Sequence, residues 1–263
     1  NSILISHGSH TYQENEFARY EHANLARGLL YSPLVTNQIS QSPIANQAAN
    51  NFMPHVSMKK YHPLMWGFKK FNENNEKISN KRIILHAGTY KFLGQRPWIY
   101  ETSSEYLRGL ILLAEAIDKL KNTKLIIRVR EMDECSLPAL AKLLPASDTY
   151  EINAKGSFLN DLSKADLLVS FSSTTIEEAL NLRKPVGLFG GTARYRHLPG
   201  SEISPTKDQR SAVYHLKEEN LSTMLDSILD VHKQSPLTND ELKGYTWPKS
   251  VPGFDNFIED IIA

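Results

Sequence analysis

Residues 165–191 read ADLLVSFSSTTIEEALNLRKPVGLFGG, and this stretch decides the expected fold. Asp166 to Ser170 (DLLVS) is an apolar run typical of a buried strand. Hydroxyl residues follow it, a helix is expected from Thr175 to Asn181, and a second buried strand from Pro185 to Phe189. A strand, a helix and a strand in such close succession indicate a βαβ unit, whose two strands run parallel.

The same alternation continues toward the N-terminus. Strands are expected at Arg82 to Ala87 (RIILHA), Lys124 to Val129 (KLIIRV) and Tyr150 to Ile152, with helices at Ser103 to Leu120, Pro138 to Leu144 and Gly156 to Lys164. The first of these helices has apolar side chains at helical spacing along one face. The pattern predicts an α/β fold, a Rossmann-like parallel sheet with helices on both faces. Ligands of such sheets bind at the carboxyl ends of the strands.

A hydrophilic stretch, residues 69–81 (KKFNENNEKISNK), is the expected linker between two domains. Residues 82–235 form the sheet domain in this interpretation, and residues 236–263 form a C-terminal tail for which we consider packing back on the first domain. Residues 1–68 are interpreted as the remnant of a preceding α/β domain.

Within that first segment, a strand is expected at Ser2 to Ser6, a helix from Glu14 to Leu30, and a short strand followed by a helix capped at Ser42. At the other end of the sheet domain, a helix is expected from Leu216 to about Lys233, and the tail after it contains proline and aromatic residues.

The composition excludes several classes of protein. Hydrophobic residues make up 41% and charged residues 22% of 263, and the net charge is +1, so the basic footprint of a nucleic-acid-binding protein is missing. The single cysteine, Cys135, rules out an internal disulfide framework, and a reducing compartment fits best. No apolar run approaches the roughly 20 residues of a membrane span. Because the chain opens inside an expected strand and without methionine, we expect a piece of a longer protein.

The turn after the strand that ends at Ser170 is the first candidate site. It carries four consecutive hydroxyl residues, Ser172, Ser173, Thr174 and Thr175. Free backbone N–H groups and the positive end of a helix dipole at such a turn together bind phosphate. Glu177 or Glu178, in the first helical turn, is placed to accept hydrogen bonds from a ribose. The alternative is helix capping, because Ser and Thr are good N-cap residues and Glu is favourable in a first turn.

Arg128 and Arg130 form the second candidate site. They alternate at the carboxyl end of an expected strand, so both side chains are expected on one face. Two guanidinium groups there suit a diphosphate or a carboxylated sugar. Glu131 follows them and is kept as a candidate of the same site. The alternative is that the arginines pair with Glu131 and Asp133 at the surface.

The third candidate site is another strand-end loop, ILHAGTYK, which contains His86, Thr89 and Lys91. Gly88 in this loop lets a ligand approach the backbone closely. Lys91 is a candidate counter-charge for phosphate. For His86 the competing interpretation is a structural histidine at the end of a strand.

The runs LHAGTYK, IRVRE and FLNDLSKADLLVSFSSTTIEEALNLRKPVGLFG together resemble the C-terminal half of GT-B glycosyltransferases. The nearest resemblance is to those that build bacterial surface polysaccharides, including capsule and lipopolysaccharide. It covers roughly residues 2–200 and is most specific in ADLLVSFSSTTIEEAL. It implies that Ser172, Ser173 and Thr174 hold donor phosphate, that Glu177 or Glu178 holds ribose, and that Arg128 and Arg130 neutralise the donor.

Two histidines have roles only in the context of such a transferase. His7, at the end of the opening strand, is a candidate general base for an acceptor hydroxyl, with an ordinary turn residue as the alternative. His197 stands beside Arg194 and Arg196 in a loop after another strand end. It is a candidate substrate contact, and the alternative is a solvated cluster of charges.

The resemblance further implies an enzyme of the bacterial cytoplasm, with peripheral contact to the inner membrane, that transfers sugar from a nucleotide sugar to a polysaccharide or lipopolysaccharide acceptor. No cofactor and no metal are expected, because the sequence has no DxD motif and fixed positive groups stabilise the leaving phosphate in this fold. The paired arginines favour a CMP-linked acidic sugar. The alternatives are a polyol-phosphate transferase or nucleotide-sugar epimerase on the same scaffold, and a non-catalytic nucleotide- or glycan-binding module.

Overall fold

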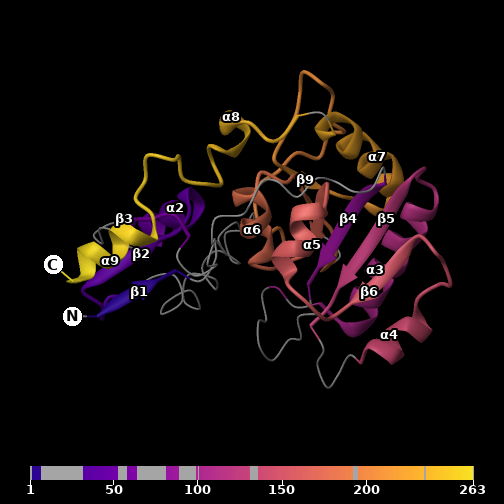
Figure 1. Cartoon of the computed structure of the whole chain (residues 1–263), viewed down its shortest axis with the longest axis horizontal. Coiled ribbons are helices and arrows are strands. Elements are labelled where there is room, and N and C mark those ends of the chain that lie inside the picture. The colour runs from indigo at the N-terminus through magenta and orange to yellow at the C-terminus, as the bar shows by residue number, and fades with distance from the viewer. Residues whose placement is uncertain are drawn as a thin grey trace. The chain divides into compact units, whose positions relative to one another are not determined.

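The computed structural model describes residues 2–6, 32–52, 58–63, 81–88, 99, 101–130, 136–191, 195–233 and 235–262. The chain divides into two compact units (Figure 1). The larger unit is Asn74–Leu237, and the smaller unit joins Asn1–Glu73 to Thr238–Ala263. The expected helix from Glu14 to Leu30 and residues 69–80 of the expected linker lie outside the described residues.

The larger unit contains a sheet of six parallel strands (Figure 1). In chain order these are β4 (Arg82–Ala87), β5 (Thr123–Arg128), β6 (Tyr150–Asn153), β7 (Leu167–Ser170), β8 (Val186–Leu188) and β9 (Val213–His215). In space they are ordered β6-β5-β4-β7-β8-β9, so the chain builds outward from β4 on one side and then outward from β7 on the other. This is the strand order of a doubly wound Rossmann sheet, and the predicted fold class is confirmed.

Helices cover both faces of this sheet (Figure 1). They are α3 (Ser103–Asp118), α4 (Leu137–Leu143), α5 (Phe158–Lys164), α6 (Thr175–Asn181) and α7 (Leu221–His232). The buried residues of α3 and α7, among them Leu113, Ile117 and Leu225, share one hydrophobic core with the strands. The helix α3 starts with a capping box, because Thr102 accepts from the Glu105 amide while the Glu105 carboxylate accepts from the Thr102 amide at 2.8 Å.

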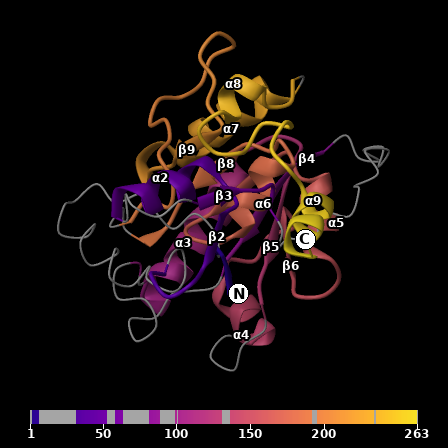
Figure 2. The same cartoon turned by 90° about the vertical axis from the view of Figure 1, so that its left-hand side faces the viewer.

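The smaller unit has a three-stranded parallel sheet in the order β1 (Ile3–Ile5), β2 (Asn37–Ser40), β3 (Met58–Lys60). Three helices belong to it: α2 (Pro43–Phe52), α8 (Asn239–Leu242) and α9 (Phe254–Ile262). Figure 2 shows its first and last elements in indigo and yellow. The Phe257 ring of α9 packs edge-on against Tyr61 with centroids 5.4 Å apart, and the Tyr61 hydroxyl donates to Asp260. Residues from both ends of the chain therefore build this core.

Most expected elements lie within a few residues of those observed, whereas the strands β3 and β9 and the helices α8 and α9 are not among those expected. The strand β9 was not expected, since a helix was predicted from Leu216; α7 begins only at Leu221, after the 3-10 turn Glu218–Asn220. Three buried residues are too few to show the alternation of a strand. The C-terminal tail, for which no helix was predicted, contains α8 and α9.

None of the described helices combines the length and the apolar character needed to cross a membrane.

Candidate functional site

The reversal of strand order places the ends of β4 and β7 next to each other. His86 of β4 is in register with Val169 of β7, and one residue further Ser170 donates from its hydroxyl to the Ala87 carbonyl oxygen at 2.6 Å. The helices that follow these two strands leave the sheet on opposite faces, so a crevice opens between them. Doubly wound sheets bind their ligands at this point, outside the carboxyl ends of the strands.

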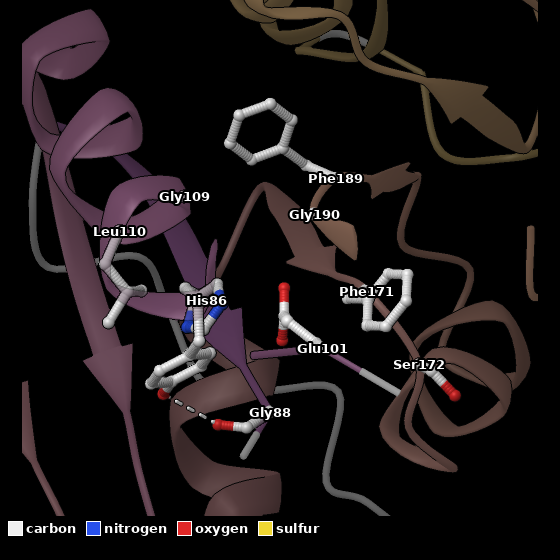
Figure 3. Close-up of a pocket in the computed structure, with 10 residues that line it drawn as sticks. His86, Gly88, Glu101, Gly109, Leu110, Phe171, Ser172, Phe189 and Gly190 are labelled. Carbon is white, nitrogen blue, oxygen red and sulfur yellow. Dashed lines mark hydrogen bonds between the residues drawn. The ribbon is translucent and has the colours of Figure 1, made fainter. Parts of the chain in front are cut away.

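A pocket lies at this switch point (Figure 3). It is a small pocket, with a cavity volume of about 20 Å³. Its lining consists of strand-end residues, Glu101 of the loop before α3, and one face of α3: His86, Gly88, Glu101, Tyr106, Gly109, Leu110, Phe171, Ser172, Phe189 and Gly190. The Tyr106 hydroxyl donates to the Gly88 carbonyl oxygen at 3.1 Å, which fixes α3 to the end of β4. The structure thus brings together His86 and Ser172, which come from two different candidate sites.

His86 is a buried, uncharged side chain in this pocket. Burial lowers its pKa to about 4, so the imidazole is neutral at physiological pH. Its Nδ1 has no hydrogen-bond partner among the described residues. Nδ1 of His86 is therefore open to a hydrogen bond with a polar group in the pocket.

Glu101 is a pocket residue that the sequence pattern did not reveal. Only 3% of it is exposed, and its Oε1 accepts a hydrogen bond from the Gly191 amide at 3.0 Å. Gly191 has φ +59°, and a Cβ there would lie 2.2 Å from the Phe171 ring, so this close approach requires glycine. The Gly-Gly pair after β8 is visible in the sequence, whereas Glu101 stands in a loop without periodicity.

The hydroxyl turn is only partly used for local capping. Ser173 accepts from the Thr175 amide at 3.3 Å. Thr174 occupies the N-cap position of α6 but makes no side-chain capping hydrogen bond. The Thr175 hydroxyl is buried, and the structure describes no hydrogen-bond partner for it. Helix capping therefore accounts for only one of these hydroxyl groups, that of Ser173.

The two adjacent glutamates have different surroundings. Glu177 is 2% exposed, and its Oε1 accepts a hydrogen bond from Nε2 of the fully buried His197 at 3.1 Å. Glu178 is half-buried; burial and, next, the neighbouring Glu177 raise its pKa to about 7. Within the described part of the chain its carboxyl group has no side-chain hydrogen bond or ion pair. Of the two, Glu178 is the one open to a ligand.

His197 and Arg128 both lie in other environments than expected. The alternative of a solvated cluster around His197 is wrong, because His197 is fully buried. Arg128 ends β5, and its Nη1 lies 2.9 Å from Asp161 Oδ2 in α5. The guanidinium group also donates to the carbonyl oxygens of Lys155 and Gly156 in the loop before α5. Arg130 is exposed. His7, Thr89, Lys91 and Glu131 lie outside the described residues.

Among the described side chains, no group of three or more His, Cys, Asp and Glu residues is arranged to hold a metal ion.

No family model and no curated protein sequence matches this chain. Solved structures do match. MnaA of S. aureus, solved with UDP, has a TM-score of 0.53 at 14% identity, over 92% of this chain and 64% of that chain. The wall teichoic acid polymerase TagF has a TM-score of 0.52 at 12% identity, over 96% and 63%. The spinosyn rhamnosyltransferase SpnG has a TM-score of 0.51 at 14% identity, over 88% and 57%.

The chain has a GT-B-like fold. It spans less than two-thirds of the length of each of these three structures. At such low identities the likeness concerns the fold alone. The switch-point pocket lies at the strand ends of the Rossmann-like sheet in the larger unit.

Proposed function

We propose that this chain is part of a glycosyltransferase that uses a nucleotide-sugar donor, and that the donor binds at the switch point between β4 and β7. One observation carries the proposal: the switch point of the doubly wound sheet coincides with a pocket and with a hydroxyl-rich turn. Sheets of this type bind nucleotides there. The GT-B-like fold agrees with the resemblance seen in the sequence.

The donor phosphate is proposed to lie against the turn of Ser172, Ser173 and Thr174, whose N–H and O–H groups donate to phosphate oxygens. Glu178 then accepts hydrogen bonds from the ribose hydroxyls. His197 is fully buried and bound to Glu177, so we place it behind the site instead of against the substrate. Arg130 and Lys91 remain candidate positive charges for the donor.

In the proposed reaction an acceptor hydroxyl attacks the anomeric carbon, and the bond from that carbon to the nucleotide phosphate breaks. The leaving phosphate takes the bonding electron pair, and its charge is stabilised by the donors of the turn. The acceptor proton passes to a general base, for which His7 is the candidate.

For the acceptor we propose a bacterial surface polysaccharide or lipopolysaccharide, reached at the inner face of the membrane. The donor class is less constrained. The argument for a CMP-linked acidic sugar used two arginines, and Arg128 is engaged with Asp161. MnaA was solved with UDP, so UDP is tested beside CMP.

A thermal-shift screen of the chain against CMP, UDP, GDP and CDP, with and without magnesium, tests the donor site. A nucleotide at 100 times its dissociation constant stabilises a fold by about 2.7 kcal/mol, which is a visible shift. We expect one nucleotide class to give this shift and Glu178→Ala to abolish it. The exposed Glu219 serves as the control position, since Glu219→Ala should leave the shift intact. No response to any of the four would overturn the proposal.

Turnover distinguishes the rival activities on the same scaffold. An epimerase consumes free nucleotide sugar without an acceptor, and a polyol-phosphate transferase uses a CDP-linked polyol instead of a nucleotide sugar. A binding module holds the nucleotide without turnover in any longer version of the protein that includes the rest of the cleft.

A further inference from the structure

We propose that the buried pair Glu177–His197 positions the hydroxyl turn for the nucleotide and that Glu177 itself makes no ligand contact; this rests on the proposed donor site. The pair links the first turn of α6 to the loop that follows β8, two segments twenty residues apart. Both side chains are almost completely inaccessible, at 0% and 2% exposure. A ribose therefore meets Glu178 and not Glu177.

The hydrogen-bond directions in this network follow from chemistry. A carboxylate only accepts, so Nε2 of His197 carries the proton and donates to Glu177 Oε1 across 3.1 Å. This fixes the ring orientation and turns Nδ1 away from Glu177, toward the loop and the turn. A carboxylate that holds a histidine in one tautomer and orientation is a common positioning device.

Nδ1 of His197 faces two hydroxyl groups, Tyr195 Oη at 3.2 Å and Ser172 Oγ at 3.5 Å. The Tyr195 hydroxyl is the nearer of the two. The longer contact, with Ser172 Oγ, holds that hydroxyl against the ring. His197 thus fixes where Ser172, the first residue of the hydroxyl turn, lies.

A second contact ties the same loop to the same turn. The Tyr195 ring packs edge-on against Phe171, with centroids 5.9 Å apart, and Phe171 directly precedes Ser172. Stability alone is a weak reason for such a polar pair, because apolar residues of similar volume often replace buried ion pairs at no loss. Removing only one partner leaves a buried polar group unsatisfied and lets the turn move.

The test compares matched variants by calorimetric titration of the folded chain with UDP and with CMP. Glu177→Leu removes the acceptor of the Nε2 proton, whereas Glu177→Gln keeps one. The control is His232→Leu, which deletes another buried histidine bonded to a tyrosine hydroxyl, that of Tyr214 at 2.9 Å. It lies on α7, outside the proposed donor site.

We expect Glu177→Leu to weaken nucleotide binding at least about tenfold, the range of one hydrogen bond to a charged group. Glu177→Gln should restore binding to within about threefold of the unsubstituted chain, and His232→Leu should lower the unfolding temperature without changing the dissociation constant. The proposal is overturned if Glu177→Leu binds as tightly as the unsubstituted chain, or if His232→Leu weakens binding equally.

Nitrogen-15 NMR keeps the test open if the leucine variant does not fold. We expect the His197 ring to show a protonated Nε2, and Glu177→Gln to shift the amide signals of Ser172 and Ser173, which His232→Leu leaves in place. A protonated Nδ1 with a bare Nε2, or unmoved amide signals, would refute the pair as a positioning device. If the unsubstituted chain binds no nucleotide, the proposed donor site is refuted. The NMR result then still decides whether the Glu177–His197 pair holds the hydroxyl turn in place.

Discussion

The hydroxyl of Ser170 donates to the backbone carbonyl oxygen of Ala87 across 2.6 Å, between the two strands where the sheet reverses its order. Both residues are buried. The hydrogen bond joins the strand end that carries His86 to the strand end that carries the hydroxyl turn, so a change here affects both sides of the candidate site.

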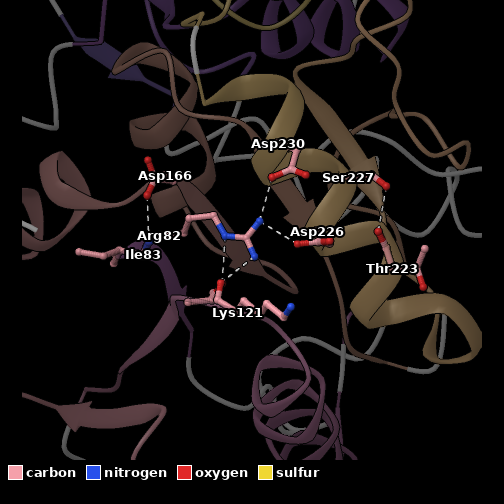
Figure 4. Close-up of polar contacts among 9 residues, drawn as sticks. Arg82, Ile83, Lys121, Asp166, Thr223, Asp226, Ser227 and Asp230 are labelled. Atoms are coloured by element: carbon pink, nitrogen blue, oxygen red, sulfur yellow. Dashed lines mark hydrogen bonds and ion pairs between the residues drawn. The ribbon is translucent and has the colours of Figure 1, made fainter. Parts of the chain in front are cut away.

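Ser170→Ala should therefore destabilise the chain. The Ala87 carbonyl oxygen loses its side-chain partner in a dry environment, which costs about 1–2 kcal/mol of unfolding free energy in urea titrations. The matched control is Ser227→Ala on α7, where the hydroxyl donates to the Thr223 carbonyl oxygen at 2.9 Å in an exposed bond (Figure 4). That variant should lie within about 0.5 kcal/mol of the unsubstituted chain. Equal losses would contradict the assigned role of Ser170.

Arg82 should contribute more than an ordinary surface arginine. It starts β4 and binds α7 through Asp226 at 2.7 Å and Asp230 at 2.9 Å, and it also donates to the Lys121 carbonyl oxygen (Figure 4). Its side chain is 15% exposed. We expect Arg82→Met to cost about 1–2 kcal/mol in urea unfolding, with little recovery in Arg82→Lys, because an ammonium group lacks the planar fork of donors.

The comparison for Arg82 is the exposed pair of Arg108 and Glu218, which are 67% and 43% exposed. Exposed ion pairs contribute little, so Arg108→Met should change the free energy of unfolding by less than about 0.5 kcal/mol. If Arg108→Met lowered the free energy of unfolding as much as Arg82→Met, burial would not account for the contribution of Arg82.

Glu178 should make the chain less stable as pH rises. Its pKa is raised from 4.5 to about 7, so the folded chain holds the proton where the unfolded chain has lost it. The free energy of unfolding then falls between about pH 4.5 and pH 7. Glu178→Gln lacks this dependence and should gain stability relative to the unsubstituted chain across that window, in urea titrations at successive pH values. A constant difference between the two would argue against the raised pKa.

His86 should have the opposite effect in an overlapping window. Its pKa is lowered from 6.5 to about 4, so as pH falls the unfolded chain takes up a proton that the folded chain refuses. Stability is lost between about pH 6.5 and pH 4, by up to about 3 kcal/mol for a fully buried group. His86→Gln keeps a donor and an acceptor without titrating, and it should flatten this loss. Because Glu178 and His86 oppose each other, only single variants reveal either.

Gly191→Ala should be more damaging than the same change at Gly156. Both residues have positive φ, but a Cβ at Gly191 would lie 2.2 Å from the Phe171 ring, and at Gly156 nothing lies within 4 Å. We expect only the backbone cost of about 1 kcal/mol at Gly156 and at least twice that at Gly191, measured by thermal unfolding. Equal effects would mean that the Phe171 ring moves aside freely.

The sequence predicts the parts of this fold that depend on local pattern. Buried strands such as Leu167–Ser170 are continuous apolar runs, and α6 has the predicted bounds, Thr175–Asn181. The strand β9 could not be predicted, because three residues are too few to show a period. The place of Glu101 in the pocket could not be predicted either, because it depends on a contact with Gly191, ninety residues away. The charged residues beside His197 in the sequence indicated a surface position, but the side chain is fully buried and hydrogen-bonded to Glu177 of α6.

The smaller unit has a consequence for synthesis. Its aromatic contact joins Tyr61 to Phe257, so the polypeptide between them must be made before that contact forms. On the ribosome, residues 74–237 are complete and free to fold while the first segment still waits for α9. The smaller unit therefore completes its core only after residues 74–237 have been made, and its strands stay without the Phe257 contact until α9 emerges.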